Sequence, residues 1–202
     1  MKENRIKKLS LLAATKFLSL YDAEYENKTG KLKHWTIASR KNLTVLEEQY
    51  FKGREEKIDA VIIAALHMSS RKLVLIRQFR VPLNGFVYEL PAGLVDGDES
   101  METSVKRELK EETGLELTHI NYERTRKSVY ASAGMTDESA AIVFCTCDGI
   151  VSKKYLEEDE DIDTILLSQQ EARELLGTDV KIDMRAFIML QAFVELGEKL
   201  FK

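Results

Sequence analysis

Three of the acidic residues in the segment 93–115, Glu108, Glu111 and Glu112, have a spacing that an isolated helix disfavours. At about 100° per residue, Glu108 and Glu112 fall on the flank of an apolar stripe formed by Met101, Val105 and Leu109. Like charges at this spacing destabilise a helix by roughly 0.2–0.5 kcal/mol per pair, and burial beside apolar side chains adds to the cost. A divalent cation would compensate these charges. Oxygen ligands without Cys or His nearby favour Mg²⁺ or Mn²⁺.

A single helix over about 99–113 would position these acids. Asp98 is the predicted N-cap, and Gly114 suits the position after the last turn, where many helices end in a left-handed conformation. Glu99 and Arg107 lie about two turns apart, so an ion pair between them would brace the preceding loop against the helix.

The whole segment is similar to the Nudix box, which reads Gly, five residues, Glu, seven residues, then Arg-Glu-apolar-any-Glu-Glu-any-Gly-apolar. An ordinary charged surface helix would explain any single pair of glutamates, but not nine specified positions at fixed spacing. The resemblance covers roughly residues 55–202 and implies the Nudix fold, an α/β/α sandwich around a mixed sheet. The matching residues are Gly93, Glu99, Arg107, Glu108, Leu109, Glu111, Glu112, Gly114 and Leu115.

The resemblance implies metal-assisted hydrolysis of a nucleoside diphosphate linked to another moiety. Bound metal ions would bridge the diphosphate oxygens and lower the pKa of the attacking water. The implied metal ligands are Glu108, Glu111, Glu112 and the backbone carbonyl of Ala92, and the implied catalytic residues include Glu111 and Glu112. Structural support would come from Gly93, Glu99, Arg107 and Gly114.

Residues 77–99 resemble the branch of ADP-ribose pyrophosphatases in their Gln-any-Arg and Glu-any-Pro-Ala-Gly segments. In that branch an arginine accompanies the box, which implies a phosphate contact for Arg80. Glu89 is a candidate for supporting the substrate side. A surface arginine at the end of a strand is the alternative explanation for Arg80.

The loop 132–138 matches the same branch only in part, because Ala133 stands where the branch usually has a proline. Glu138 is a candidate residue of the substrate pocket. This departure weakens the prediction that ADP-ribose is the substrate, but not the prediction of the reaction.

The run of five acids at 157–161 allows two interpretations. A bare acidic run is usually a solvated loop. The pyrophosphatases that the chain resembles place a mobile acidic loop here, which supplies the general base or another metal ligand. This resemblance makes Glu158 and Glu160 the candidates.

Residues 1–54 are predicted to form a small β region beside the Nudix hydrolase domain, residues 55–202. The runs 16–25 and 32–40 are rich in aromatic and β-branched residues and favour a hairpin, with a further extended segment over 43–51. Because a hairpin of this size does not stand alone, it should pack on a partner surface, which predicts a homodimer.

The resemblance also implies that strands of this region contact the nucleobase across the dimer. Trp35, the only tryptophan, and Arg40 are the candidates. Core packing is the alternative explanation for Trp35.

The rest of the chain predicts strands with helices between and after them, so the fold class is α/β (α+β) with a mixed sheet between helices. Ser168 with Glu171 forms a capping box before a short helix, and Asp183 caps a long helix over 184–201. The predicted strands are 58–67, 72–79, 86–90, 116–122, 126–131, 139–147 and 162–167.

The composition of the chain limits the kinds of partner that it can bind. The chain has 202 residues, 44% of them hydrophobic, and a net charge of −4, so one sizeable core is expected and no overall field attracts nucleic acid or an anionic membrane. The N-terminus lacks an uninterrupted signal core, which predicts a cytoplasmic protein. Cys145 and Cys147 are expected to be buried thiols, with metal or redox chemistry as the alternative.

Together these features predict an Mg²⁺-dependent pyrophosphatase of nucleoside diphosphate sugars, with ADP-ribose, split into AMP and ribose 5-phosphate, as the favoured substrate. One alternative is another nucleotide sugar or a dinucleotide. The other is a Nudix module that senses a nucleotide without turnover, which the retained acids Glu108, Glu111 and Glu112 disfavour.

Overall fold

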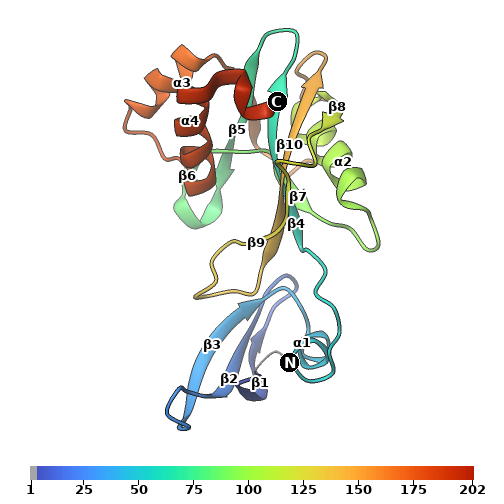
Figure 1. Cartoon of the computed structure of the whole chain (residues 1–202), viewed down its shortest axis with the longest axis vertical. Helices are drawn as coiled ribbons and strands as arrows, with labels where there is room; N and C mark the ends of the chain where they lie inside the picture. Colours follow the sequence, from blue (N-terminus) through green and yellow to red (C-terminus); the bar gives the residue numbers. More distant parts are fainter. Residues whose placement is uncertain (1–3) are drawn as a thin grey trace. The chain divides into compact units, whose positions relative to one another are not determined.

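The computed structural model describes residues 4–202, and contacts within the chain divide it into two units (Figure 1). The first unit extends to Asp59 and also includes Val129–Ala140, and the second contains Ala60–Ser128 and Ala141–Lys202. The sequence suggested a single division after residue 54. The structure adds a later segment to the first unit, and among their contacts Lys41 binds both Asp59 and Asp137, at 2.9 and 2.8 Å.

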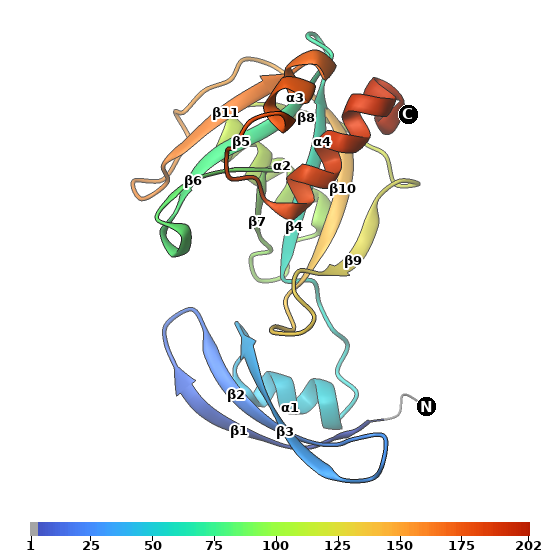
Figure 2. The same ribbon diagram turned by 90° about the vertical axis from the view of Figure 1, so that its left-hand side faces the viewer.

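The first unit is a three-stranded antiparallel sheet with one helix against it (Figure 2). Strands β2 (Ser19–Glu26) and β3 (Leu32–Ser39) form the predicted hairpin, in full register from Ser19 opposite Ser39 to Glu26 opposite Leu32. Strand β1 (Ile6–Ala14) pairs with β2 and was not predicted, because its leucines do not alternate in a simple inward and outward pattern.

The prediction of an extended segment over 43–51 was wrong, because this stretch is helix α1 (Leu43–Phe51). Its N-cap is Asn42, whose side chain accepts a hydrogen bond of 3.0 Å from the N–H of Val45. Leu46 is fully buried against Leu9 and Tyr21 of the sheet. The cap and this packing together override the β-forming residues in the segment.

Replacing Asn42 by Ala is therefore expected to lower the free energy of unfolding by about 1 kcal/mol, because the N–H of Val45 loses its acceptor. Urea denaturation followed by far-UV circular dichroism measures the change. The matched control is Asn42→Asp, which keeps an acceptor and should unfold close to the wild type. Equal losses in both variants would contradict the capping role.

The second unit is built on an eight-stranded sheet with the central order β11-β5-β4-β10-β8. Strand β6 also pairs with β5, β7 with β4, and β9 with β10. In Figures 1 and 2, helices α3 and α4 lie on one face of this sheet and α2 on the other, as the predicted sandwich requires. The strands are β4 (Ala60–His67), β5 (Lys72–Arg80), β6 (Gly85–Glu89), β7 (Ala92–Leu94), β8 (Glu116–Ile120), β9 (Arg126–Tyr130), β10 (Ser139–Asp148) and β11 (Ile162–Leu167). The helices are α2 (Met101–Thr113), α3 (Gln169–Leu176) and α4 (Met184–Leu196), with 3₁₀ turns η1 (Val81–Leu83) and η2 (Gly197–Phe201).

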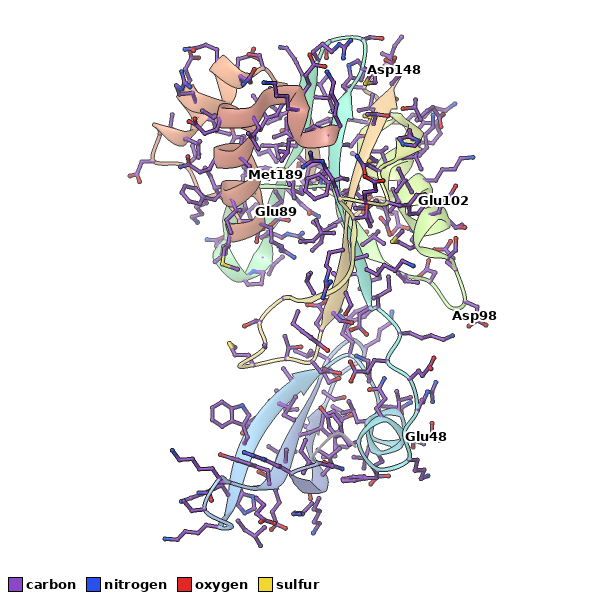
Figure 3. All side chains as sticks on the ribbon, viewed as in Figure 1. Glu48, Glu89, Asp98, Glu102, Asp148 and Met189 are labelled. Atoms are coloured by element: carbon purple, nitrogen blue, oxygen red, sulfur yellow. The ribbon has the colours of Figure 1, made fainter. Side chains whose placement is uncertain are left out.

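The ends of helix α2 confirm one predicted cap and correct the other. Gly114 ends the helix in the left-handed region with φ +76°, as predicted. The N-cap is Ser100 rather than Asp98, because the Ser100 side chain accepts the hydrogen bond from the N–H of Thr103. Figure 3 shows Asp98 at the tip of the loop that precedes α2.

The C-terminal helices have the predicted starts but a different end. Ser168 and Glu171 form the complete capping box of α3, and Asp183 caps α4. The long predicted helix stops at Leu196, where Gly197 with φ +55° breaks it before η2. The short strand β7 was not predicted either, because three residues carry too little periodicity.

Both cysteines are buried in β10, as predicted. Burial raises the pKa of the Cys145 thiol, and burial raises that of Cys147 to about 12. Both thiols are therefore protonated and unreactive at neutral pH. Within residues 4–202, no helix is long and apolar enough to cross a membrane.

Candidate active site

Helix α2 turns two carboxylates toward the sheet. Val105 and Leu109 are fully buried and anchor the helix, while Glu108 and Glu112 on the same side are only 9% and 5% exposed. Glu111, in contrast, keeps 42% of its side chain exposed. The box therefore buries two of its three acids, and buried carboxylates need compensation.

Glu108 lies directly against the backbone of strand β7. A Cβ atom placed on Gly93 would stand 1.9 Å from the carboxyl carbon of Glu108, far inside contact distance. Gly93 pairs with Val61 of β4, so the backbone beneath it is fixed by the sheet. Only glycine leaves room for the Glu108 carboxylate at this place.

Glu112 is held one residue earlier on the same strand. Its Oε2 accepts a hydrogen bond of 3.0 Å from the backbone N–H of Ala92. Burial raises the pKa of Glu112 well above its ordinary value, and the charges of Glu108 and Glu160 act in the same direction. The Ala92 N–H and the charge of Arg80 oppose this shift but do not cancel it.

Arg107 connects the acids of the box. Its Nη2 donates to Glu99 at 3.0 Å, which is the ion pair that the spacing predicts. Its Nη1 also donates to Glu108 at 2.7 Å and to Glu111 at 3.0 Å, contacts that the sequence did not suggest. Nη2 further binds the carbonyl of Leu94 at 2.9 Å, so the arginine ties the loop before α2 to the helix.

The acids do not form a ready ligand cluster in this arrangement. Among residues 4–202, no group of three or more His, Cys, Asp or Glu side chains is positioned to hold a metal ion. The Arg107 contacts explain part of this, because Arg107 supplies the positive charge next to Glu108 and Glu111. The backbone N–H of Ala92 donates to Glu112. The family resemblance assigned a different atom of Ala92, its carbonyl oxygen, to a metal.

Arg80 and Glu89, predicted separately, form one ion pair. The Nε of Arg80 donates to the two carboxylate oxygens of Glu89 at 3.0 and 3.1 Å, and Nη2 also binds Glu89. Glu89 is 7% exposed and stands opposite Ile76 in the β5–β6 register. A buried carboxylate thus fixes the orientation of the Arg80 guanidinium.

Thr164 is a site residue that the sequence did not reveal. Its hydroxyl donates to the backbone carbonyl of Glu112 at 3.1 Å. Thr164 faces Ile76 in the β11–β5 register, as Glu89 does from β6 on the other side of β5. Paired residues in antiparallel strands share a face, so Arg80, Glu89 and Thr164 lie on the face that α2 covers.

The acidic loop 157–161 contributes charge to the site. The charge of Glu160 raises the pKa of both Glu108 and Glu112, after the larger effect of burial on each. Glu160 itself accepts a hydrogen bond of 2.9 Å from the N–H of Glu157, which turns the loop back on itself. Glu160 is therefore the acid of this loop that the structure relates to the box.

Three of the predicted substrate-binding residues lie in the first unit. The indole N–H of Trp35 donates to the carbonyl of Gly134 at 3.1 Å. Arg40 donates to Glu138 at 3.0 Å. The structure thus brings Trp35, Arg40 and Glu138 together around the loop 132–138, and their role toward a substrate stays a prediction.

A sheet between helices, with paired buried carboxylates and a fixed arginine on one face, is an arrangement that suits hydrolysis of a pyrophosphate bond. The family model described as NUDIX domain matches residues 56–189. The chain therefore belongs to the Nudix family, in the branch that resembles ADP-ribose pyrophosphatases.

Relatives and solved structures agree with this assignment. An uncharacterized Nudix hydrolase of Schizosaccharomyces pombe is 32% identical over 66% of this chain and 60% of its own length. The ADP-ribose pyrophosphatase of Saccharomyces cerevisiae is 28% identical over 85% of this chain and 71% of its own length. A crystal structure of an ADP compounds hydrolase matches with a TM-score of 0.65 at 19% identity, over 94% of both chains, and shows the same fold.

Proposed function

We propose that the protein hydrolyses the diphosphate linkage of ADP-ribose to give AMP and ribose 5-phosphate, with Mg²⁺ or Mn²⁺ as cofactor. The observation that carries this proposal is the pair of buried carboxylates, Glu108 and Glu112, held against the backbone at Ala92 and Gly93. The similarity to the yeast ADP-ribose pyrophosphatase supports the choice of substrate.

The residues of the site fit a hard divalent cation. Burial raises the pKa of Glu108 and of Glu112, so their charged forms gain from a cation nearby. Their donors are carboxylate oxygens, which Mg²⁺ and Mn²⁺ prefer. Glu108, Glu111, Glu112 and the Ala92 carbonyl would hold the metal, which supplies charge neutralisation at the diphosphate and an acidified water.

The side chains around the acids have separate roles in this proposal. Arg80 binds a phosphate oxygen, and Glu89 positions its guanidinium. In the described part of the chain, Nη1 of Arg80 makes no hydrogen bond, so it is available to the substrate. Glu160 is the proposed acceptor of the proton of the attacking water, and its charge acts on both Glu108 and Glu112.

Glu160→Gln is expected to lower kcat by about 10²–10⁴-fold while metal affinity stays near normal, because the base is lost and the metal ligands remain. Steady-state kinetics and calorimetric titration with Mn²⁺ measure the two quantities. Glu158→Gln is the matched variant in the same loop and should retain more activity. If both variants turn over substrate like the wild type, the acidic loop has no part in the reaction.

A panel of nucleoside diphosphate derivatives tests the proposed substrate. AMP formation from ADP-ribose, dependent on added Mg²⁺, is the expected result. Faster turnover of another nucleotide sugar or of a dinucleotide would assign the enzyme to that substrate. Binding of these compounds without any turnover would instead support a nucleotide sensor.

The predicted homodimer also remains a proposal, now supported by an exposed apolar surface on the first unit. Leu12 and Phe17 are 57% and 66% exposed, and Leu11 and Leu18 beside them are exposed as well. Patches of this kind often mark protein interfaces. Light scattering at micromolar concentration should give twice the chain mass, and the mass of a monomer would rule the dimer out.

A further inference from the structure

The first unit contains a pocket of about 250 Å³ that the diphosphate chemistry does not explain. Its walls come from three parts of this unit: strand β3, helix α1 and the segment 130–137. The side chains that matter are Trp35, Tyr50, Tyr130 and Asp137. All of them belong to the first unit, so the pocket is complete within it.

Two of the three aromatic side chains of the pocket are fixed by hydrogen bonds of their polar edges. The indole N–H of Trp35 binds the carbonyl of Gly134 at 3.1 Å, and the hydroxyl of Tyr130 donates to Glu56 at 3.1 Å. The N–H of Ala38 donates to the carbonyl of Met135 at 2.9 Å, which fixes the loop on which Gly134 lies. Both side-chain hydrogen bonds use the polar edges of the side chains, so neither involves a ring face.

Asp137 is the charged side chain among the described residues that line the pocket. Asp137 and Asp59 share the single ammonium group of Lys41, so one negative charge remains uncompensated within this group. The Oδ1 atom of Asp137 is buried and has no hydrogen-bond partner in the described residues, 4–202. Burial, and next the charge of Asp137, raise the pKa of Tyr50. No lysine or arginine is among the described residues that line the pocket.

We propose that this pocket binds an organic cation of the quaternary ammonium class. Three aromatic side chains line the pocket, and the face of an aromatic ring attracts a cation through its quadrupole. The charge of Asp137 adds to this attraction. A quaternary ammonium group has no N–H, so the charge of Asp137 attracts it without a hydrogen bond. An anion would meet the charge of Asp137 without a basic lining residue to receive it.

The test uses Trp35 as its own reporter, because it is the only tryptophan of the chain. The chain of 202 residues is titrated with choline chloride at constant ionic strength, without Mg²⁺, and its fluorescence is recorded. The matched ligand is 3,3-dimethylbutan-1-ol, in which a carbon atom replaces the charged nitrogen. We expect saturable binding of choline and affinity for the neutral compound that is about 5- to 30-fold weaker.

Two variants locate the binding. Tyr130→Leu removes a ring and should weaken choline binding about 5-fold, whereas Tyr130→Phe keeps the ring face and should bind like the wild type. Both variants lose the contact with Glu56, so their difference isolates the ring. Tyr130 is 54% exposed, and neither change disturbs a buried core.

Three outcomes would overturn the proposal: no saturable response to choline, equal affinity for the neutral compound, or equal choline binding by the two Tyr130 variants. Adenine serves as the neutral flat competitor. If adenine binds more tightly than choline, the pocket takes a nucleobase, as the sequence suggested for Trp35, and the cation assignment is wrong. None of these measurements depends on the hydrolytic activity.

Discussion

Replacing Glu112 by Gln is expected to lower kcat by about 10³-fold while leaving the fold at least as stable as the wild type. Activity falls because the amide cannot supply the negative charge that a divalent cation requires. Stability is kept because the amide oxygen can still accept the hydrogen bond from the N–H of Ala92. The variant also removes a carboxyl whose charged form is disfavoured by burial, which raises its pKa.

Steady-state kinetics on the substrate found by the panel and thermal unfolding without metal measure these two effects. The matched control is Glu102→Gln in the first turn of the same helix, where the exposed carboxylate binds only the hydroxyl of Tyr122 among the hydrogen bonds found in residues 4–202. This control should keep full activity. An E112Q protein with wild-type kcat would remove the box from the reaction, and one that fails to fold would show that the carboxylate is structural.

Replacing Gly93 by Ala is expected to lower kcat by about 10²-fold through displacement of the Glu108 carboxylate. The added Cβ would stand 1.9 Å from the carboxyl carbon of Glu108, so the glutamate or strand β7 must move. The affinity for Mn²⁺, measured by calorimetry, should fall together with kcat. Overpacking of this kind also costs about 1–3 kcal/mol of stability, which urea unfolding measures.

The matched control for Gly93 is Gly134→Ala, because a Cβ at Gly134 meets no atom within 4 Å. Neither glycine has a positive φ angle, so the two variants differ in space and not in backbone strain. The control should retain the stability and the Mn²⁺ affinity of the wild type. If G93A also retains them, the close approach of Glu108 has no role in the site.

The sequence predicts most of the box because its positions interact locally. Spacing along one helix is enough to place Glu108 and Glu112 on the buried face of α2, and to pair Glu99 with Arg107. It was not enough to choose between Asp98 and Ser100 as the N-cap. Both are good capping residues two positions apart, and the backbone of the loop decides between them.

Contacts between strands could not be predicted, because they depend on register. Arg80 and Glu89 are nine residues apart on β5 and β6, and only the pairing of these strands brings the arginine to the carboxylate. Thr164 reaches Glu112 across 52 residues of sequence through the pairing of β11 with β5. The sequence identifies such residue types but not their partners.

Helix α1 shows where local propensity misleads. The segment 43–51 contains β-forming residues, which favour a strand. The helix forms instead because Asn42 caps it and because Leu46 packs on the apolar surface of the sheet. Burial in a core that only the folded unit creates decided the outcome.

The position of Lys41 has a consequence for how this chain can be divided. Its ammonium group joins the end of the N-terminal region to a hairpin that emerges between strands β9 and β10, much later in the sequence. Cutting the gene after codon 54 would therefore not release two independent modules. The shorter piece would lack Val129–Ala140, which belongs to the same unit. The longer piece would retain Asp59 and Asp137 without Lys41, the counter-ion that they share.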